Sequence, residues 1–168
     1  DEFLTADLDD DVAAAVRRTA EQLEELGHRV VPISLPSADM AVAAYYIIAD
    51  SEASSNLARY DGVRYGLRAA GALALKRMYA ATRSEGFGAE VKRRIMLGAF
   101  ALSSGYHDEY YRRASQVRTL LRREFETAFA RVDLLLGPVT PTPPFELGER
   151  LEDPLQRYLA DLFTTPAS

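Results

Sequence analysis

The sequence contains no cysteine, and histidine occurs only at His28 and His107. The absence of cysteine excludes a disulfide framework, a thiolate zinc site and a cysteine nucleophile. Two histidines leave few candidates for a histidine-based triad. The sequence has no apolar run of the roughly 18 residues that a membrane span needs, and its first residues lack the basic and apolar stretches of a signal peptide. We therefore expect a soluble, cytoplasmic protein with no membrane contact.

Basic residues are outnumbered by acidic ones, 20 to 25. The 168 residues carry a net charge of −5 at pH 7, with an isoelectric point near 5.1. This balance gives no overall attraction to nucleic acid or to an anionic membrane, although basic residues concentrate between positions 76 and 123. Hydrophobic residues make up 48% of the chain, which at this length is enough for one domain with a core.

Two apolar runs predict strands between helices. Acidic residues 9–11 precede a helix that Gly27 ends, and residues 30–35 follow as a short β-rich run that stops at Pro36. Residues 133–139 predict a second, buried strand, and the proline-rich segment 140–144 then leaves its carboxyl end. Helix, turn and strand in succession are typical of an α/β fold.

Further helices are predicted between and after these runs. We expect helices over residues 37–59, about 73–83, 90–102, 106–132 and 153–163, with a hinge at residues 86–88. Arginines flank the apolar stripe of the helix at 106–132, and acidic residues interrupt them. This row is typical of a solvated helix face, and RNA binding is the alternative.

The helix at 90–102 carries the principal candidate site residue. Val91, Ile95, Gly98 and Leu102 recur with helical spacing, and Gly105 is placed to end the helix. Arg94 lies at the border of this buried face. Its guanidinium either reaches into a cleft or remains a solvated charge, and periodicity leaves both readings open. The polar turn at residues 51–56 is similarly open between a frayed or capping turn and one that lines a site.

Five segments carry a resemblance to a known family. They resemble the A subunits of the Asp/Glu-tRNA amidotransferases, which are glutaminase members of the amidase signature family. In order along the chain, the segments are SEASSNLARYDGVRYG (51–66), SEGFGAEVKRRIMLGAFALSSGY (84–106), VRTLLRREF (117–125), LLLGPVTPTPPFELGE (134–149) and DPLQRYLADLFTTPAS (153–168). The resemblance covers nearly all of the chain but only the downstream part of the family's domain.

The resemblance implies an α/β fold in which residues 1–168 form a single partial domain. This would be the helix-rich part of an amidase-signature fold, with a mixed central sheet that is incomplete in this chain. The family's chemistry uses a lysine and two serines near a Gly/Ser-rich signature, and no Gly-Gly-Ser-Ser-Gly-type stretch occurs here. We therefore assign no catalytic residue and no metal ligand, and we expect the 168 residues alone to be inactive.

The resemblance also implies substrate-binding residues. An arginine of the Lys-Arg-Arg helix is expected to hold the carboxylate of glutamine, with a tyrosine from an earlier helix lining the same pocket. In this sequence these residues are Arg94 and Tyr45, with Arg93 and Tyr46 as neighbouring alternatives. Asp50 departs from the family pattern, which is expected to have a small residue or proline there.

The implied function is that of a glutamine amidohydrolase subunit. It would supply ammonia for the ATP-dependent conversion of Glu-tRNA(Gln) to Gln-tRNA, or of Asp-tRNA(Asn) to Asn-tRNA. The implied partners are B and C subunits, glutamine, and charged tRNA reached through the complex. No cofactor is expected in this subunit, because ATP and magnesium belong to the partner. The alternatives are a stand-alone amidase-signature hydrolase of a small amide and a non-enzymatic helical interaction module.

Overall fold

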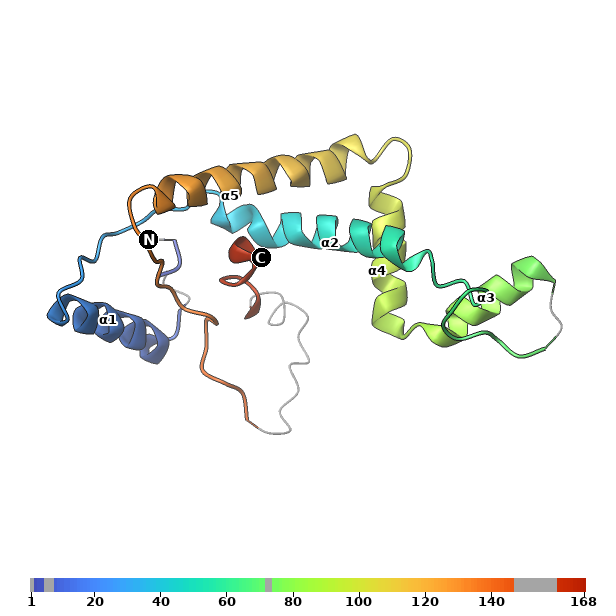
Figure 1. The fold of residues 1–168 in the computed structure, drawn as a ribbon, viewed down its shortest axis with the longest axis horizontal. Coiled ribbons are helices and arrows are strands. Elements are labelled where there is room, and N and C mark those ends of the chain that lie inside the picture. Colours follow the sequence, from blue (N-terminus) through green and yellow to red (C-terminus); the bar gives the residue numbers. More distant parts are fainter. Residues whose placement is uncertain (1, 5–7, 72–73, 147–159) are drawn as a thin grey trace. The chain divides into compact units, whose positions relative to one another are not determined.

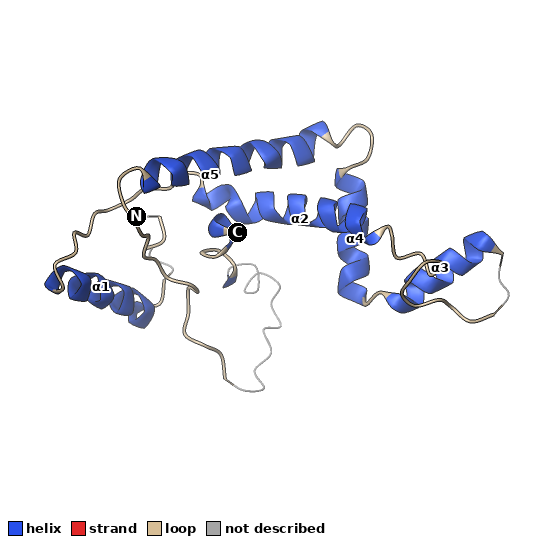
Figure 2. Ribbon diagram, in the orientation of Figure 1, coloured by secondary structure: helices blue, strands red, loops and turns tan. Residues whose placement is uncertain are grey.

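The fold consists of helices joined by extended segments (Figures 1 and 2). The structure, a computed structural model, describes residues 2–4, 8–71, 74–146 and 160–168. The chain divides into two compact units: the first unit comprises Asp1–Ala44 with Gln116–Ser168, and the second comprises Tyr45–Ser115. The elements are α1 (Asp10–Glu25), η1 (Ala38–Met40), α2 (Ala41–Leu57), α3 (Leu75–Gly86), α4 (Ala89–Ala101), η2 (Asp108–Arg112), α5 (Arg113–Phe129) and η3 (Thr165–Ala167).

Helix α1 confirms the prediction from its end signals. The Asp9 carboxylate caps its start by accepting a hydrogen bond from the Asp11 backbone N–H at 2.9 Å, and Asp10 and Asp11 lie in its first turn. Negative charge there stabilises the positive end of the helix dipole. Gly27 follows the helix with φ of +90°, a left-handed conformation that glycine adopts without steric cost.

The two predicted strands are wrong for the described part of the chain. Neither residues 30–35 nor residues 133–139 form a strand, and no strand occurs elsewhere among the described residues, so the mixed sheet is not seen there. The apolar run at residues 133–139 is also not buried, because Leu134 and Leu136 are 85% and 50% exposed. A strand requires backbone hydrogen bonds to a neighbouring strand, and the bonds of the described residues include no such ladder for either run.

The first unit has a small apolar core. Leu8, Ala13 and Phe163 are buried together, and the ring of Phe3 lies 5.3 Å from that of Phe163, centroid to centroid. The extended segments border an apolar cavity of about 660 Å³ in this unit. Its lining includes Ile33, Leu35, Phe125, Phe129, Leu134, Leu135 and Leu136. The leucine run therefore contributes to an apolar surface without being enclosed by it.

Within the first unit, the Glu124 side chain links α5 to the start of η1 through hydrogen bonds. Its carboxylate accepts two hydrogen bonds from Ser37, one from the hydroxyl at 2.6 Å and one from the backbone N–H at 3.1 Å. Ser37 is 6% exposed. The backbone N–H groups at a helix start have no partner inside the helix, so a carboxylate placed there satisfies a donor and is favoured by the dipole.

In the second unit the predicted helices are present with shifted ends. Helix α3 runs over Leu75–Gly86, and the predicted start at Leu73 lies outside the described residues. Helix α4 runs over Ala89–Ala101 with Leu102 as its C-cap, so the prediction that Gly105 caps the helix is wrong. Gly105 has the predicted left-handed φ, +94°, but lies in the turn that follows. Of the residues 86–88 predicted as a hinge, Gly86 ends α3, and residues 87–88 form the short link to α4.

The last two predicted helices differ more from the structure. The helix predicted over residues 106–132 begins as a π-helical turn at Asp108 and continues as α5 to Phe129. Most of the helix predicted over residues 153–163 lies outside the described residues. The described end of the chain forms the short helix η3.

Candidate functional site

A close helix crossing in the second unit positions the candidate site. Gly98 of α4 lies against the backbone of Asp50 in α2, so near that a Cβ atom at residue 98 would come within 1.9 Å of the Asp50 carbonyl oxygen. It would also lie 2.8 Å from the Ser54 Cβ atom. Only glycine permits this approach. Because Arg94 lies one helical turn before Gly98, the crossing brings its side chain beside α2.

The Arg94 guanidinium lies among residues from both helices. Its Nε donates a hydrogen bond to Glu90 Oε1 at 2.9 Å, and its Nη1 lies 3.8 Å from Asp50 Oδ1. Its central carbon is 5.6 Å from the centroid of the Tyr46 ring, within range of a cation–π interaction. The Arg94 side chain is 34% exposed. It is therefore neither enclosed in the core nor extended into solvent.

Hydrogen bonding and burial act on the ionisation of these groups. The hydrogen bond to Glu90 raises the pKa of Arg94, and hydrogen bonding with the Tyr45 side chain raises it further. The same bond from Arg94 lowers the pKa of Glu90. Burial raises the pKa of Asp50, while the charge of Arg94 opposes that rise. Arg94 thus remains a permanent cation beside two carboxylates.

The structure separates the two candidate arginines. Arg93 forms an ion pair with Glu90, but its side chain is 68% exposed and none of its ion pairs in the described residues reaches α2. Arg94, by contrast, reaches α2, where its guanidinium lies over the ring of Tyr46. The two tyrosine rings meet edge to face with centroids 5.4 Å apart. Tyr46 presents its ring to the Arg94 guanidinium, and the Tyr45 side chain contributes to the raised pKa of Arg94.

This arrangement can bind a carboxylate. A guanidinium pairs with a carboxylate through two parallel N–H donors, and a tyrosine hydroxyl can donate a third hydrogen bond. Among the described residues, no group of three or more His, Asp or Glu side chains could hold a metal ion.

The sequence did not identify two residues beside Arg94. Glu90 precedes Arg94 by four residues, and this spacing alone predicts an ion pair on a helix surface. Asp50 is different, because its side chain is only 6% exposed and its contact with Arg94 joins two helices. The one signal in the sequence was an acid at the end of the apolar run 41–49.

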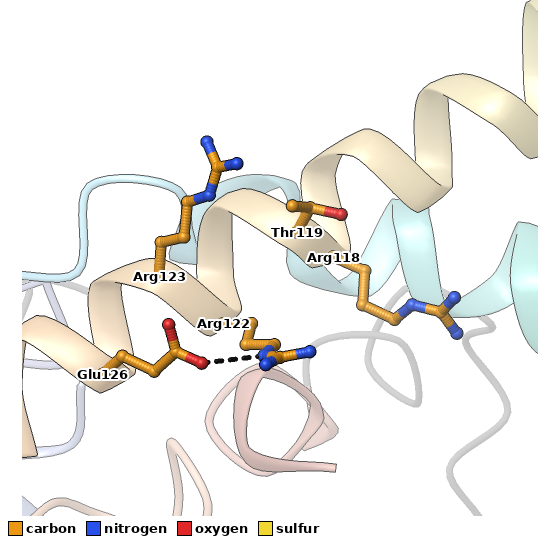
Figure 3. Close-up of a pocket in the computed structure, with 5 residues that line it drawn as sticks. All are labelled: Arg118, Thr119, Arg122, Arg123 and Glu126. Carbon is orange, nitrogen blue, oxygen red and sulfur yellow. Dashed lines mark hydrogen bonds and ion pairs between the residues drawn. The ribbon is translucent and has the colours of Figure 1, made fainter.

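The arginines of α5 form a separate basic surface in the first unit, shown in Figure 3. Arg118, Arg122 and Arg123 border a cavity of about 410 Å³ together with Thr119 and Glu126. Arg122 pairs with Glu126 at 2.8 Å, while Arg123 and Arg118 point in different directions. The guanidinium groups do not converge on one point. This arrangement fits the solvated helix face that the sequence predicts.

The chain belongs to the amidase family, whose family model matches residues 1–168. Several curated relatives are named as the A subunit of glutamyl-tRNA(Gln) amidotransferase. The chain is 58% identical over 167 residues to that of Myxococcus xanthus (strain DK1622), covering 99% of this chain and 34% of the relative. It is 60% identical over 163 residues to that of Anaeromyxobacter dehalogenans (strain 2CP-C), covering 97% of this chain and 33% of the relative.

The chain thus spans about a third of the length of the curated relatives it matches. These matches confirm the resemblance found in the five sequence segments. Within the part of the chain that the structure describes, no helix is long and apolar enough to cross a membrane.

Proposed function

We propose that this chain is part of the A subunit of a glutamyl-tRNA(Gln) amidotransferase. In this role the complete subunit hydrolyses glutamine to glutamate and ammonia, and the ammonia amidates the glutamate of a misacylated tRNA in a cytoplasmic complex. B and C subunits are the proposed partners, and charged tRNA is reached through that complex. ATP and magnesium are used by a partner subunit, with no cofactor in this one. The names and identities of the relatives support this proposal.

Within that subunit, Arg94 and Tyr45 bind glutamine. The observation that carries this assignment is the position of the Arg94 guanidinium beside α2, where it is 34% exposed and lies 5.6 Å from the centroid of the ring of Tyr46, the neighbour of Tyr45. Its Nε is bound to Glu90, and its Nη1 is outside hydrogen-bond distance of Asp50. The Nη edge is therefore placed to pair with the α-carboxylate of glutamine. Tyr45 completes the pocket through its hydroxyl and ring.

Glutamine kinetics of the full-length protein, assembled with its partner subunits, test this assignment. Arg94→Ala removes a charge-assisted pair worth about 1.5–3 kcal/mol, so the KM for glutamine should rise about 10-fold or more. Arg94→Lys should also raise KM, because an ammonium cannot reproduce the two-donor geometry. The effect should fall mainly on KM, since the pairing is made in the ground state and the transition state alike.

Arg93→Ala is the matched control, because it removes the adjacent arginine on the same helix. Arg93 is 68% exposed and pairs with the same Glu90. Its replacement should leave the KM for glutamine within about twofold, as expected for an exposed ion pair. An unchanged KM in Arg94→Ala, or an equal effect of Arg93→Ala, would refute the assignment of Arg94. Glutamine turnover without any ammonia transfer to tRNA in the presence of partner subunits would favour a stand-alone amidase instead.

A further inference from the structure

We propose that Asp50 is a positioning residue for Arg94, holding its guanidinium beside α2 so that its outer edge meets the ligand. This inference rests on the proposed function, because it assigns a role to Asp50 in the same glutamine site.

The burial of Asp50 supports this role. Asp50 is 4% exposed, and its Oδ1 atom has no hydrogen-bond partner among the described residues. A buried carboxylate is costly unless an opposite charge lies close to it. The cation within ion-pair distance is Arg94, whose Nη1 lies 3.8 Å away. The attraction therefore acts on both partners, and it draws the long, flexible arginine side chain towards α2.

The helix crossing fixes the geometry of this pair. The backbone of Asp50 lies against Gly98, and Arg94 is four residues before Gly98 on the same helix. Tyr46 is four residues before Asp50 on α2 and presents its ring to the same guanidinium. Both charged groups thus extend from rigid backbone within about one helical turn of the crossing. A site built on helices holds its side chains in a more precise geometry than a site built on loops.

The distances also explain how Asp50 can position Arg94 without competing for it. At 3.8 Å, the Asp50 oxygen is too far to accept a hydrogen bond from Nη1, so the donor is not consumed. The Asp50 side chain is 6% exposed and the Arg94 side chain is 34% exposed, so a ligand arriving from solvent meets Arg94 first. Coulomb interactions weaken with distance and in water, so the attraction for Arg94 outweighs the repulsion of a ligand carboxylate.

A double-mutant cycle in the full-length, assembled enzyme tests the proposal. Asp50→Asn should raise the KM for glutamine about threefold or more and leave kcat within about twofold. In an Arg94→Ala background, the same Asp50→Asn change should alter KM by less than about twofold, because its effect passes through the missing guanidinium. A merely structural contribution would instead change KM and kcat by the same factors in both backgrounds.

Asp108→Asn is the matched control, because it makes the same chemical change in the same unit at a side chain that is 76% exposed. It should leave KM unchanged. Thermal unfolding of every variant identifies a folding defect, and Asp50→Ala replaces Asp50→Asn if the amide does not fold, with the same expected rise in KM. An unchanged KM in a folded Asp50 variant overturns the inference, as does an equal effect with and without Arg94.

The two proposals fail differently in this experiment. If Arg94→Ala raises KM but neither Asp50 variant does, the glutamine site stands and the positioning role of Asp50 is wrong. If Arg94→Ala leaves KM unchanged, the assigned glutamine site fails, and the inference for Asp50 fails with it.

Discussion

Replacing Gly98 by alanine tests the helix crossing on which the candidate site depends. The added Cβ atom would lie 1.9 Å from the Asp50 carbonyl oxygen, 2.4 Å from its carbonyl carbon and 2.8 Å from the Ser54 Cβ atom. Ordinary contacts at such positions begin at 3.4 Å, so α4 would have to move away from α2 by about 1.5 Å. The obstacle is backbone and cannot rotate aside.

Two opposing effects determine the size of the change. Overpacking of this kind costs about 1–3 kcal/mol, and a clash with backbone lies at the upper end of that range or above it. Alanine in a helix interior stabilises the helix by about 1 kcal/mol relative to glycine. The clash exceeds the gain, so Gly98→Ala should lower the free energy of unfolding of the protein by about 2 kcal/mol, measured by urea denaturation. It should also raise the KM for glutamine, because Arg94 moves with α4.

Gly88→Ala is the control for this experiment. Gly88 begins the same helix with φ of −63°, and an added Cβ atom would meet nothing within 4 Å. Its replacement should change the free energy of unfolding by less than about 1 kcal/mol. If Gly98→Ala proves as stable as the original protein, the close crossing of α2 and α4 is wrong, and so is the position it gives to Arg94.

Two further predictions concern the first unit. Glu124→Ala removes both hydrogen bonds to Ser37 and should destabilise the protein by about 1–2 kcal/mol in urea denaturation. The control Glu126→Ala breaks an exposed ion pair with Arg122 and should destabilise it by less than about 0.5 kcal/mol. Equal destabilisation by the two substitutions would contradict the capping role of Glu124. The hydrogen bond from Ser34 lowers the pKa of Glu2 from 4.5 to about 2. Its contribution to stability is therefore present above about pH 4.5 and lost as the pH falls towards 2. The free energy of unfolding of the original protein should therefore fall more between pH 4.5 and 2 than that of Glu2→Gln. Solvent screening keeps this difference under about 1 kcal/mol. The same pH dependence of unfolding in both proteins would refute the prediction.

Local signals in the sequence predicted the helices well. Acidic residues before α1, Gly27 after it, and the spacing of Val91, Ile95 and Gly98 in α4 all act within one or two turns of the chain. The border position of Arg94 followed from the same periodicity. Such features need no knowledge of what packs against them.

The strands and the environment of Arg94 were less predictable, because they depend on distant partners. The run 133–139 has strand-like composition, but composition does not supply the neighbour with which a strand must pair. The burial of Asp50 depends on Gly98, which is 48 residues further along the chain. No pattern within α2 indicates that another helix approaches its backbone at that residue.

The exposed leucines after α5 have a consequence for handling the polypeptide. Leu134 and Leu136 present apolar side chains to solvent, and the backbone of residues 133–139 forms no backbone hydrogen bond with the part of the chain that the structure describes. Such a segment can pair edge to edge with its own copies and begin aggregation. Pro138 and Pro141 lack the N–H groups needed to extend this pairing, so they limit the aggregation-prone segment to a few residues.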